Sequence, residues 1–291
     1  MTSIQTRFIK QYRAIRYQLF KKQAPQQLPA DRGVEVDIIL PVIEKDLQTL
    51  PLCLRGIQEG INHPIRAIYL VAPPTPALIR FAEANNLRFL DEQTVLGYTP
   101  KEIGFITDKG ENRSGWIFQQ LLKLSASIGT CRHYITIDAD HILLRPHTFI
   151  TLDHSYVLYR SREYYPPYRH NIIQLLGDCR TSVFDLSFIA HKMVFDRERV
   201  VQLQQTLSER HHTTWDKAIV GSLNRSVISP FSEFETYGNF LHPSLYRSLP
   251  WREKSIQFSP AHTFESLQHT YGKSYHAVTV PEYEQKIKPN K

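Results

Sequence analysis

The amino-acid sequence predicts an α/β protein with a mostly parallel central sheet flanked by helices. Within the first hundred residues, apolar strand-like runs alternate with segments of helical spacing. Such a β-α-β-α-β order produces parallel strands with helices on both faces. A later strand-like run of aromatic and β-branched residues, residues 134–137, ends directly in Asp138-Ala139-Asp140. This arrangement places two carboxylates at the carboxyl end of a strand, which is where sheets of this class bind ligands.

The composition narrows the class of protein. The chain has 291 residues, of which 42% are hydrophobic and 22% charged, as is ordinary for a globular domain of this size. Its three cysteines, Cys53, Cys131 and Cys179, have neither the spacing of a zinc site nor the even number of a disulfide framework, so we expect a reducing, cytoplasmic setting. No apolar run reaches the roughly 18 residues of a membrane span, and the N-terminus lacks the apolar region of a signal peptide.

The basic charge balance suggests three kinds of partner. The formal net charge is +7, which favours nucleic acid, anionic lipid or a substrate that carries phosphate. The sequence contains neither the aromatic motif of an RNA-binding domain nor a paired Cys/His finger. We therefore expect no nucleic-acid partner and favour the other two.

Residues 1–30 form a basic amphipathic lead-in, with a helix followed by a Pro- and Gly-containing linker over residues 23–33. A helix of this kind lies on an anionic membrane surface or packs on the domain with a solvated basic face, and the sequence favours neither. Residues 34–291 are predicted to form one domain, with residues 34–146 and 147–291 as its halves.

The first half is expected to begin with a strand that is covered on both faces, because residues 36–40 are largely apolar and β-branched. Pro41 closes this strand and Asp46 follows in the turn. No GxGxxG or GxxxxGK[ST] motif occurs, which excludes a classical dinucleotide fold and a P-loop kinase. The expected elements are strands at 35–42, 65–71 and 87–90, helices at 47–60 and 77–86, and a loop at 98–108.

An apolar stripe with helical spacing predicts a helix over residues 115–128. Another stripe carries Trp116, Gln120 and Lys123, and Gln119 lies one turn before Lys123. If this stripe faces a cleft, the lysine can meet a phosphate and the glutamines can bind hydroxyl groups. The alternative is a lysine that lies along the protein surface.

Asp138 and Asp140 lie on the same side of the chain if the strand continues through them. Buried carboxylates without partners cost several kcal/mol, so the pair needs a cation or hydrogen-bond donors. Mg²⁺ and Mn²⁺ suit such a site because they prefer oxygen ligands and leave positions open for water and phosphate. The alternative is a strand that simply ends in polar residues, because Asp-x-Asp alone is a weak signal.

The second half is predicted to contain strands at 148–158, 188–195, 255–258 and 277–280, the first either continuous or in two pieces bent around Asp153. It is also predicted to contain helices at 164–176, 197–207, 215–223 and 232–241, and a loose end from residue 282. His191 lies within one of these strands, as a core or cleft histidine. Ser232 and Glu235 have the spacing of a capping box. Glu233 has no such capping role, although the helix dipole favours its charge.

Four of these pieces together resemble the GT-A type glycosyltransferases, and in particular a bacterial group linked to surface polysaccharides. They are the strand that ends in Pro41 with an acid in the turn, the GWxxQQxxK helix, the Asp-Ala-Asp strand end with Leu-Arg-Pro after it, and SEFExYG from Ser232 to Gly238. The resemblance covers most of residues 34–245. It implies a GT-A, Rossmann-like sheet with a nucleotide-sugar half at 34–146 and an acceptor half with the tail at 147–291.

The resemblance also implies an activity and its partners. The donor would be a nucleotide sugar, most often a UDP-sugar, with Mn²⁺ or Mg²⁺ as cofactor. The acceptor would be a glycan or a lipid-linked glycan in polysaccharide synthesis, on the inner face of the membrane if the lead-in helix binds lipid. The reaction would be a hexosyltransferase-like transfer with inversion.

The roles that the resemblance implies are assigned residue by residue. Asp140 is the more direct metal ligand beside Asp138, and a late histidine completes the site, with His242 chosen over His262 and His276. Glu233 is the general base for the acceptor hydroxyl, with Glu235 in reserve. The acceptor would contact His191 and Tyr237. The donor site comprises Pro41, Asp46, Trp116, Gln119, Gln120, Lys123, Asp138 and Ala139.

Two other functions compete with this one. A nucleotidyltransferase would carry a Gly-rich basic loop after its first strand, whereas the segment here is PVIEKDLQTLP, without glycine. A non-catalytic, membrane-associated scaffold would have lost the aspartates or Glu233, and all three are present. We therefore favour the metal-dependent glycosyltransferase.

Overall fold

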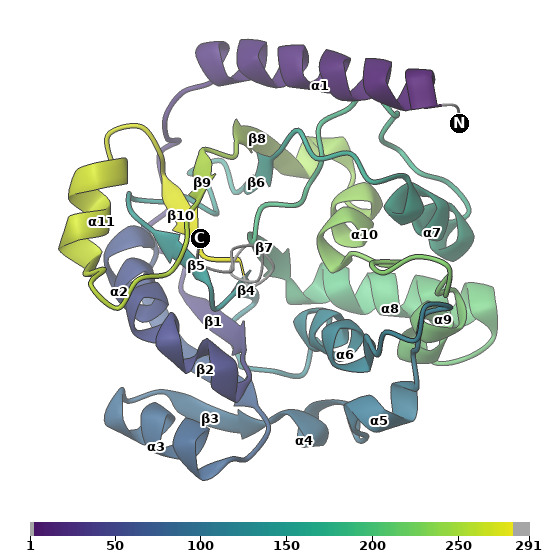
Figure 1. Cartoon of the computed structure of the whole chain (residues 1–291), viewed down its shortest axis with the longest axis horizontal. Helices are drawn as coiled ribbons and strands as arrows, with labels where there is room; N and C mark the ends of the chain where they lie inside the picture. The colour runs from purple at the N-terminus through teal and green to yellow at the C-terminus, as the bar shows by residue number, and fades with distance from the viewer. Residues whose placement is uncertain (1–2, 282–291) are drawn as a thin grey trace, which may run out of the picture.

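The central sheet has the strand order β3-β2-β1-β4-β7 in the computed structural model of the chain, which describes residues 3–281 (Figure 1). Strands β1 to β4 pair in parallel, and β7 pairs antiparallel with β4. This confirms the predicted fold class, a mostly parallel sheet flanked by helices. The strands are β1 (Val36–Pro41), β2 (Ile65–Ala72), β3 (Arg88–Asp91), β4 (His133–Ile137) and β7 (Lys192–Asp196).

Strand β1 lies in the middle of this sheet, and all six of its residues are buried. The β-branched and apolar side chains fit a strand that is covered on both faces. Asp37 is the polar exception: one carboxylate oxygen accepts hydrogen bonds from the backbone N–H groups of Thr130 (2.7 Å) and Cys131 (2.8 Å). The predicted buried strand is therefore present, with a carboxylate that ties it to the loop before β4.

Helices cover the sheet. Helix α6 (Ser114–Lys123) packs on β1, α8 (Arg197–His211) packs on β7, and α3 (Pro76–Ala84) packs beside β3. Helix α2 (Leu50–Gly60) packs against a smaller sheet, where a Cβ on Gly56 would lie 2.7 Å from the backbone nitrogen of Leu143. The other helical segments are η1 (Glu44–Gln48), α4 (Glu92–Leu96), α5 (Pro100–Ile103), α7 (Pro166–Leu176), α9 (Trp215–Gly221), α10 (Glu233–Phe240) and η2 (Pro243–Leu245).

Two smaller sheets connect the C-terminal part of the chain to the middle. Strand β10 (Ala277–Thr279) lies between β5 (His141–Leu143) and β9 (Glu253–Ser255), and β6 (Tyr156–Arg160) pairs with β8 (Tyr246–Pro250). Helix α11 (Phe264–Tyr271) packs on α2 and β10. The C-terminal segment therefore covers the residues that directly follow Asp140.

The N-terminal helix α1 (Ser3–Gln23) lies along one edge of the molecule, far from the central sheet (Figure 1). It contacts the body through Arg13, Arg16 and Tyr17, which hydrogen-bond to backbone carbonyls of distant segments. The helix thus packs on the domain, as in one of its two predicted arrangements, but its basic residues are not all solvated because Arg13 is buried against the body. Among residues 3–281, no helix combines the length and apolar character that crossing a membrane requires.

Several predicted boundaries were wrong. The helix expected over 115–128 ends at Lys123, because Ser125, Ser127 and left-handed Gly129 (φ 78°) follow. The strand expected over 188–195 begins only at Lys192, because His191 is left-handed, and the strand expected over 148–158 reduces to β6 after a turn at His154 (φ 58°). Helix α5 lies within the predicted loop and α4 borders it, and β9 overlaps the strand expected at 255–258 only at Ser255. The loose end predicted from residue 282 lies outside the described residues.

Candidate functional site

A cleft of about 560 Å³ lies at the carboxyl ends of β1 and β4. It is lined by the turn after β1, by one face of α6 and by the Asp-Ala-Asp segment after β4. Parallel strands bring their carboxyl ends to one edge, which explains why distant segments converge here. All eight predicted donor residues lie on this cleft: Pro41, Asp46, Trp116, Gln119, Gln120, Lys123, Asp138 and Ala139.

Asp138 is the most heavily bonded carboxylate of the site. Lys123 Nζ donates to its Oδ1 at 2.6 Å, and His191 Nδ1 lies 2.9 Å from its Oδ2. The same lysine donates to Glu233 Oε1 at 2.8 Å, so one buried ammonium group connects two carboxylates. Burial raises the pKa of Asp138, but Lys123 and His191 outweigh burial and hold that pKa well below its usual range. Asp138 is therefore ionised.

Asp140 is the contrasting carboxylate. Its side chain lines the cleft and has no hydrogen bond or ion pair within residues 3–281. Burial raises its pKa to about 7, with His191 opposing and the Asp138 charge reinforcing the rise. Ligand atoms of Asp138, Asp140 and His191 all lie within 4.8 Å of one another. Two carboxylates and an imidazole at this spacing fit a divalent cation, which would supply the missing partner of Asp140.

His191 reaches this cluster through an unusual backbone conformation. Its φ is 54°, in the left-handed region, and its carbonyl oxygen accepts a hydrogen bond from the Asp138 N–H at 3.0 Å. A residue other than glycine costs roughly 1–2 kcal/mol there, and such strain concentrates at functional sites. Burial lowers the pKa of His191, but the carboxylates of Glu253, Asp138 and Asp140 raise it to about 10. Without a metal, the ring is therefore an imidazolium between carboxylates.

A buried layer of polar side chains lies behind this cluster. Lys192 Nζ is 3.0 Å from His141 Nε2, and His141 Nδ1 is 2.9 Å from Thr279 Oγ1. The Thr279 hydroxyl donates to Glu253, and the His141 and His191 rings stack 5.8 Å apart. Burial lowers the pKa of Lys192 to about 8, although the Glu253 carboxylate opposes this. No local sequence pattern indicates this layer, because β9 and β10 join the site only through tertiary pairing.

Helix α6 lines a long side of the cleft. Trp116 is half-buried, and the Arg113 guanidinium lies 4.7 Å from the centre of its ring. Gln119, Gln120 and Lys123 continue along the same helix face toward Asp138. The predicted polar stripe therefore faces the cleft, and Arg113 and Lys45 are cleft residues that the sequence analysis missed.

Glu92 is a further cleft residue that the sequence did not indicate. It follows β3, the edge strand on the side of the sheet away from β4, and is only 6% exposed. No hydrogen bond or ion pair to it occurs among the described residues, and burial raises its pKa to about 7. A buried acid that faces a cleft without a donor is suited to a ligand N–H or O–H group.

The two glutamates predicted as general base, Glu233 and Glu235, do not lie on the cleft. Glu233 is 2% exposed and does not line the cleft; it meets the site only through Lys123. Glu235 accepts hydrogen bonds from Ser187 Oγ and from the Phe188 N–H at 3.2 Å, so the expected capping box does not form, although Ser232 does cap the helix. These placements do not support a general base at either position.

The predicted acceptor and metal residues were also partly wrong. Tyr237 is fully buried in the core, where its hydroxyl accepts a hydrogen bond from the Asp196 N–H at 2.9 Å, so an acceptor cannot contact it. His242 is exposed and caps η2 through Ser244, apart from the aspartates. His276 contacts Gln26, and His262 is not part of the candidate cluster among the described residues. His191, predicted for the acceptor, lies beside Asp138 and Asp140, where His242 was expected.

Residues 35–280 match a family of unknown function, DUF6492. This chain belongs to that family. The family description assigns no activity, and a search of curated proteins found no match. The chemistry of this DUF6492 member therefore has to be argued from its site.

Three solved structures are similar to this family member over most of its length. Mouse xyloside xylosyltransferase 1 in its apo form aligns over 88% of this chain and 100% of its own, with 13% identity and a TM-score of 0.48. The galactosyltransferase LgtC with donor and acceptor sugar analogues aligns over 84% and 87%, with 11% identity and a TM-score of 0.41. The apo glycosyltransferase GlyE of Streptococcus pneumoniae TIGR4 aligns over 86% and 55%, with 12% identity and a TM-score of 0.39.

Proposed function

We propose that this protein is a metal-dependent glycosyltransferase that uses a nucleotide-sugar donor. The observation that carries the proposal is the Asp140 carboxylate, which faces a cleft of about 560 Å³ and has no side-chain partner among residues 3–281. It lies within 4.8 Å of the ligand atoms of Asp138 and His191. This set suits Mn²⁺ or Mg²⁺, and the cleft has room for a nucleotide.

Different residues of the cleft would bind the metal and the phosphate groups of such a donor. A bound Mn²⁺ or Mg²⁺ would supply Lewis-acid neutralisation of the diphosphate leaving group. Asp140 would be the direct ligand, while Lys123 keeps Asp138 ionised and in place. The cations Lys45 and Arg113 also line the cleft, where their charge attracts phosphate.

Other cleft residues suit the uncharged parts of the donor. Trp116 offers a ring on which a base can stack, and Gln119 and Gln120 offer amide groups to sugar hydroxyls. We propose a UDP-sugar as the donor class, because the resemblance to the GT-A type glycosyltransferases implies one. The cleft also contains Glu92, which is available to a base or ribose donor group.

The acceptor in this proposal is a glycan or a lipid-linked glycan in surface polysaccharide synthesis, with the protein on the inner face of the membrane. Transfer with inversion of the anomeric configuration stays a prediction. The general base assigned to it, Glu233, is bound to Lys123 and does not line the cleft. The anomeric configuration of an isolated product tests it directly.

The proposal is tested by a thermal-shift panel of nucleotides and nucleotide sugars, each with and without Mn²⁺. A ligand at 100 times its Kd stabilises the folded state by about 2.7 kcal/mol. We expect at least one nucleotide sugar to raise the Tm only with Mn²⁺. Asp140→Asn should abolish this metal dependence, and the matched surface variant Asp108→Asn should preserve it. If no nucleotide shifts the Tm in either condition, the non-catalytic scaffold replaces the transferase.

A further inference from the structure

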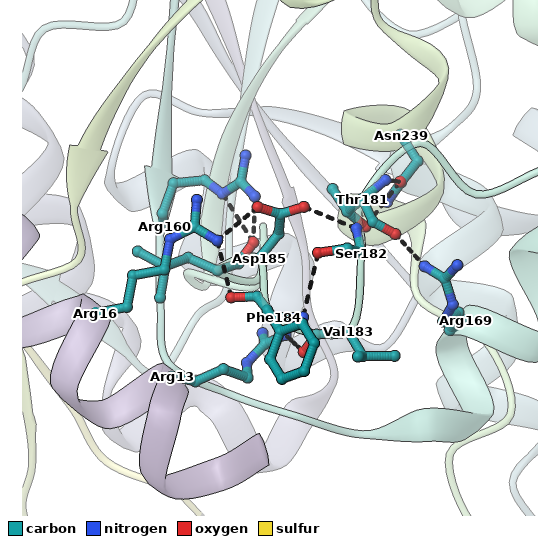
Figure 2. Close-up of polar contacts among 11 residues, drawn as sticks. Arg13, Arg16, Arg160, Arg169, Thr181, Ser182, Val183, Phe184, Asp185 and Asn239 are labelled. Carbon is teal, nitrogen blue, oxygen red and sulfur yellow. Dashed lines mark hydrogen bonds and ion pairs between the residues drawn. The ribbon is translucent and has the colours of Figure 1, made fainter. Parts of the chain in front are cut away.

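Helix α1 packs on the body through a face that mixes apolar and basic side chains. Ile9 (6% exposed) and Tyr17 (9% exposed) are buried there together with Arg13, which is 5% exposed and donates to the carbonyls of Val183 (3.1 Å) and Glu163. Arg16 donates to the Phe184 carbonyl (2.9 Å) and to Asp185 (2.7 Å), and Figure 2 shows both arginines pointing from α1 toward this segment. Amphipathic helices normally bury their apolar side chains, but this face does not account for the other large apolar side chains of α1.

A second apolar stripe of α1 faces outward, away from the buried Ile9 and Tyr17. Five large side chains form it; they are spaced three or four residues apart, so they share one helix face, and each is at least 45% exposed. Phe184 extends this surface, because its ring lies 5.0 Å from that of Tyr12 and is itself exposed. We call this surface the α1 face; it consists of Ile4, Phe8, Tyr12, Ile15, Leu19 and Phe184.

A contiguous exposed apolar surface of this kind marks an interaction site. Isolated apolar residues on a protein surface need no explanation, but a complete helical stripe does. The hydrogen bonds of Arg13 and Arg16 fix the orientation of the helix, so that the stripe cannot turn inward without breaking them.

The charge around the α1 face selects the partner. Residues 3–23 contain six basic side chains and no acidic one. Arg13 is buried against the body, and the other five are at least partly exposed: Arg7, Lys10, Arg16, Lys21 and Lys22. A groove of about 560 Å³ also runs between α1 and the body, and its charged lining consists of Arg16, Arg160, Arg180 and Asp185. Three guanidinium groups against one carboxylate leave this groove positive. The partner should therefore present an apolar region to the α1 face and negative charges to the basic groups beside it.

A second copy of the chain fits these requirements poorly, because two α1 helices would place like charges against each other. An anionic bilayer meets both the apolar and the charge requirement. Its acyl chains can contact the apolar stripe, and its phosphate groups can bind the arginines and lysines. We propose that the α1 face docks this protein on an anionic membrane, with lipid phosphates at the arginine-lined groove. This inference extends the proposed function by giving a location for its lipid-linked acceptor, but it does not depend on donor binding.

The test is flotation of the full-length protein with vesicles of phosphatidylcholine alone or with phosphatidylglycerol added. We expect flotation with the anionic vesicles, at least tenfold weaker partition for Phe8→Ser with Ile15→Ser, and weaker binding at high salt. The variant Arg7→Gln with Lys10→Gln, which removes two exposed charges, should bind the anionic vesicles about fivefold more weakly for each residue replaced. The matched control Val201→Ser with Ile228→Ser removes exposed apolar groups away from α1 and should float like the wild type.

Two results would overturn the docking proposal. One is wild-type protein that stays with the unbound fraction at all vesicle compositions, and the other is equal flotation of the Phe8/Ile15 variant. If size-exclusion chromatography instead shows a dimer that this variant converts to a monomer, without flotation, the α1 face is an interface between copies. Neither nucleotide nor Mn²⁺ enters this assay, so failure of the proposed transferase and failure of docking are distinguishable.

Discussion

At the scale of single residues, Asp138 and Asp140 are two positions apart but have opposite surroundings. Asp138 is held by Lys123 and His191, whereas Asp140 has no side-chain partner among the described residues. Lys123 and His191 therefore hold the pKa of Asp138 below its usual range, whereas burial raises the pKa of Asp140 to about 7. Pairs of titratable groups with diverging pKa values are typical of functional sites.

Binding of Mn²⁺ is expected to tighten as the pH rises, because the ion must displace protons. The pKa of Asp140 is raised to about 7 from 3.8 and that of His191 to about 10 from 6.5. In the metal-free protein, the stability that each raised pKa contributes is present below its unfolded value and is lost as the pH rises through its folded value. We expect calorimetry to count about two protons released per ion below pH 7 and about one near pH 8.

The variants His191→Ala and His242→Ala complete this test. The first should remove the proton released near pH 8 and weaken Mn²⁺ binding, because the ring lies among the candidate ligands. The second should match the wild type, because His242 caps η2 away from the cluster. Proton release at pH 8 that persists in His191→Ala would contradict the assignment of His191 as a ligand.

Glu92→Gln is expected to stabilise the protein at pH 8 by about 2 kcal/mol, because it removes a buried charge that has no partner in the described part of the chain. The pKa of Glu92 is raised from 4.5 to about 7, so its contribution to stability is present below 4.5 and is lost as the pH rises through about 7. Urea unfolding at pH 5 and pH 8 measures the effect, which should shrink at the lower pH. Equal stability of the variant and the wild type at pH 8 would contradict it; Glu83→Gln on the exposed side of α3 is the control.

At the scale of elements, the connection from α6 to β4 decides how the site is assembled. Helix α6 supplies Lys123 and β4 delivers Asp138, and Asp37 of β1 holds the loop between them through two backbone N–H groups. Gly129 makes this close approach possible, with φ 78°. The glycine is therefore required for both its conformation and its size.

Gly129→Ala is expected to destabilise the protein by about 3 kcal/mol, since it combines a left-handed alanine with a contact that the buried carboxylate cannot accommodate. An added Cβ would lie 2.4 Å from Asp37 Oδ2. Gly115→Ala is the matched control: it has open space in α6 and should be neutral or slightly stabilising. Urea unfolding of both variants measures the difference, and similar midpoints would refute the role assigned to Gly129.

At the scale of the whole molecule, the two halves of the chain share one sheet. Strand β7, from the second half, pairs with β4 over five residues, and β10 near the C-terminus pairs with β5 directly after Asp140. The main hydrophobic core likewise contains residues from both halves. The cleft therefore depends on contacts that join the beginning, middle and end of the described chain.

Heat unfolding is expected to be a single cooperative transition, because neither half has a complete sheet without the other. Scanning calorimetry should give equal calorimetric and van't Hoff enthalpies in metal-free protein. Two separated transitions would mean that residues 34–146 and 147–291 unfold independently. Circular dichroism in the near and far ultraviolet should follow the same curve.

The sequence alone determined the sheet class, the buried first strand, the polar face of α6 and the Asp-Ala-Asp segment at a strand end. These features depend on local periodicity and residue type, which the sequence shows directly. Only the tertiary structure decided that His191, not His242, joins the aspartates, that Glu233 is buried against Lys123, and that Glu92 faces the cleft. It also decided that the apolar stripe of α1 faces outward. Each of these outcomes depends on contacts between segments far apart in the chain, and no local pattern encodes which distant group a side chain meets.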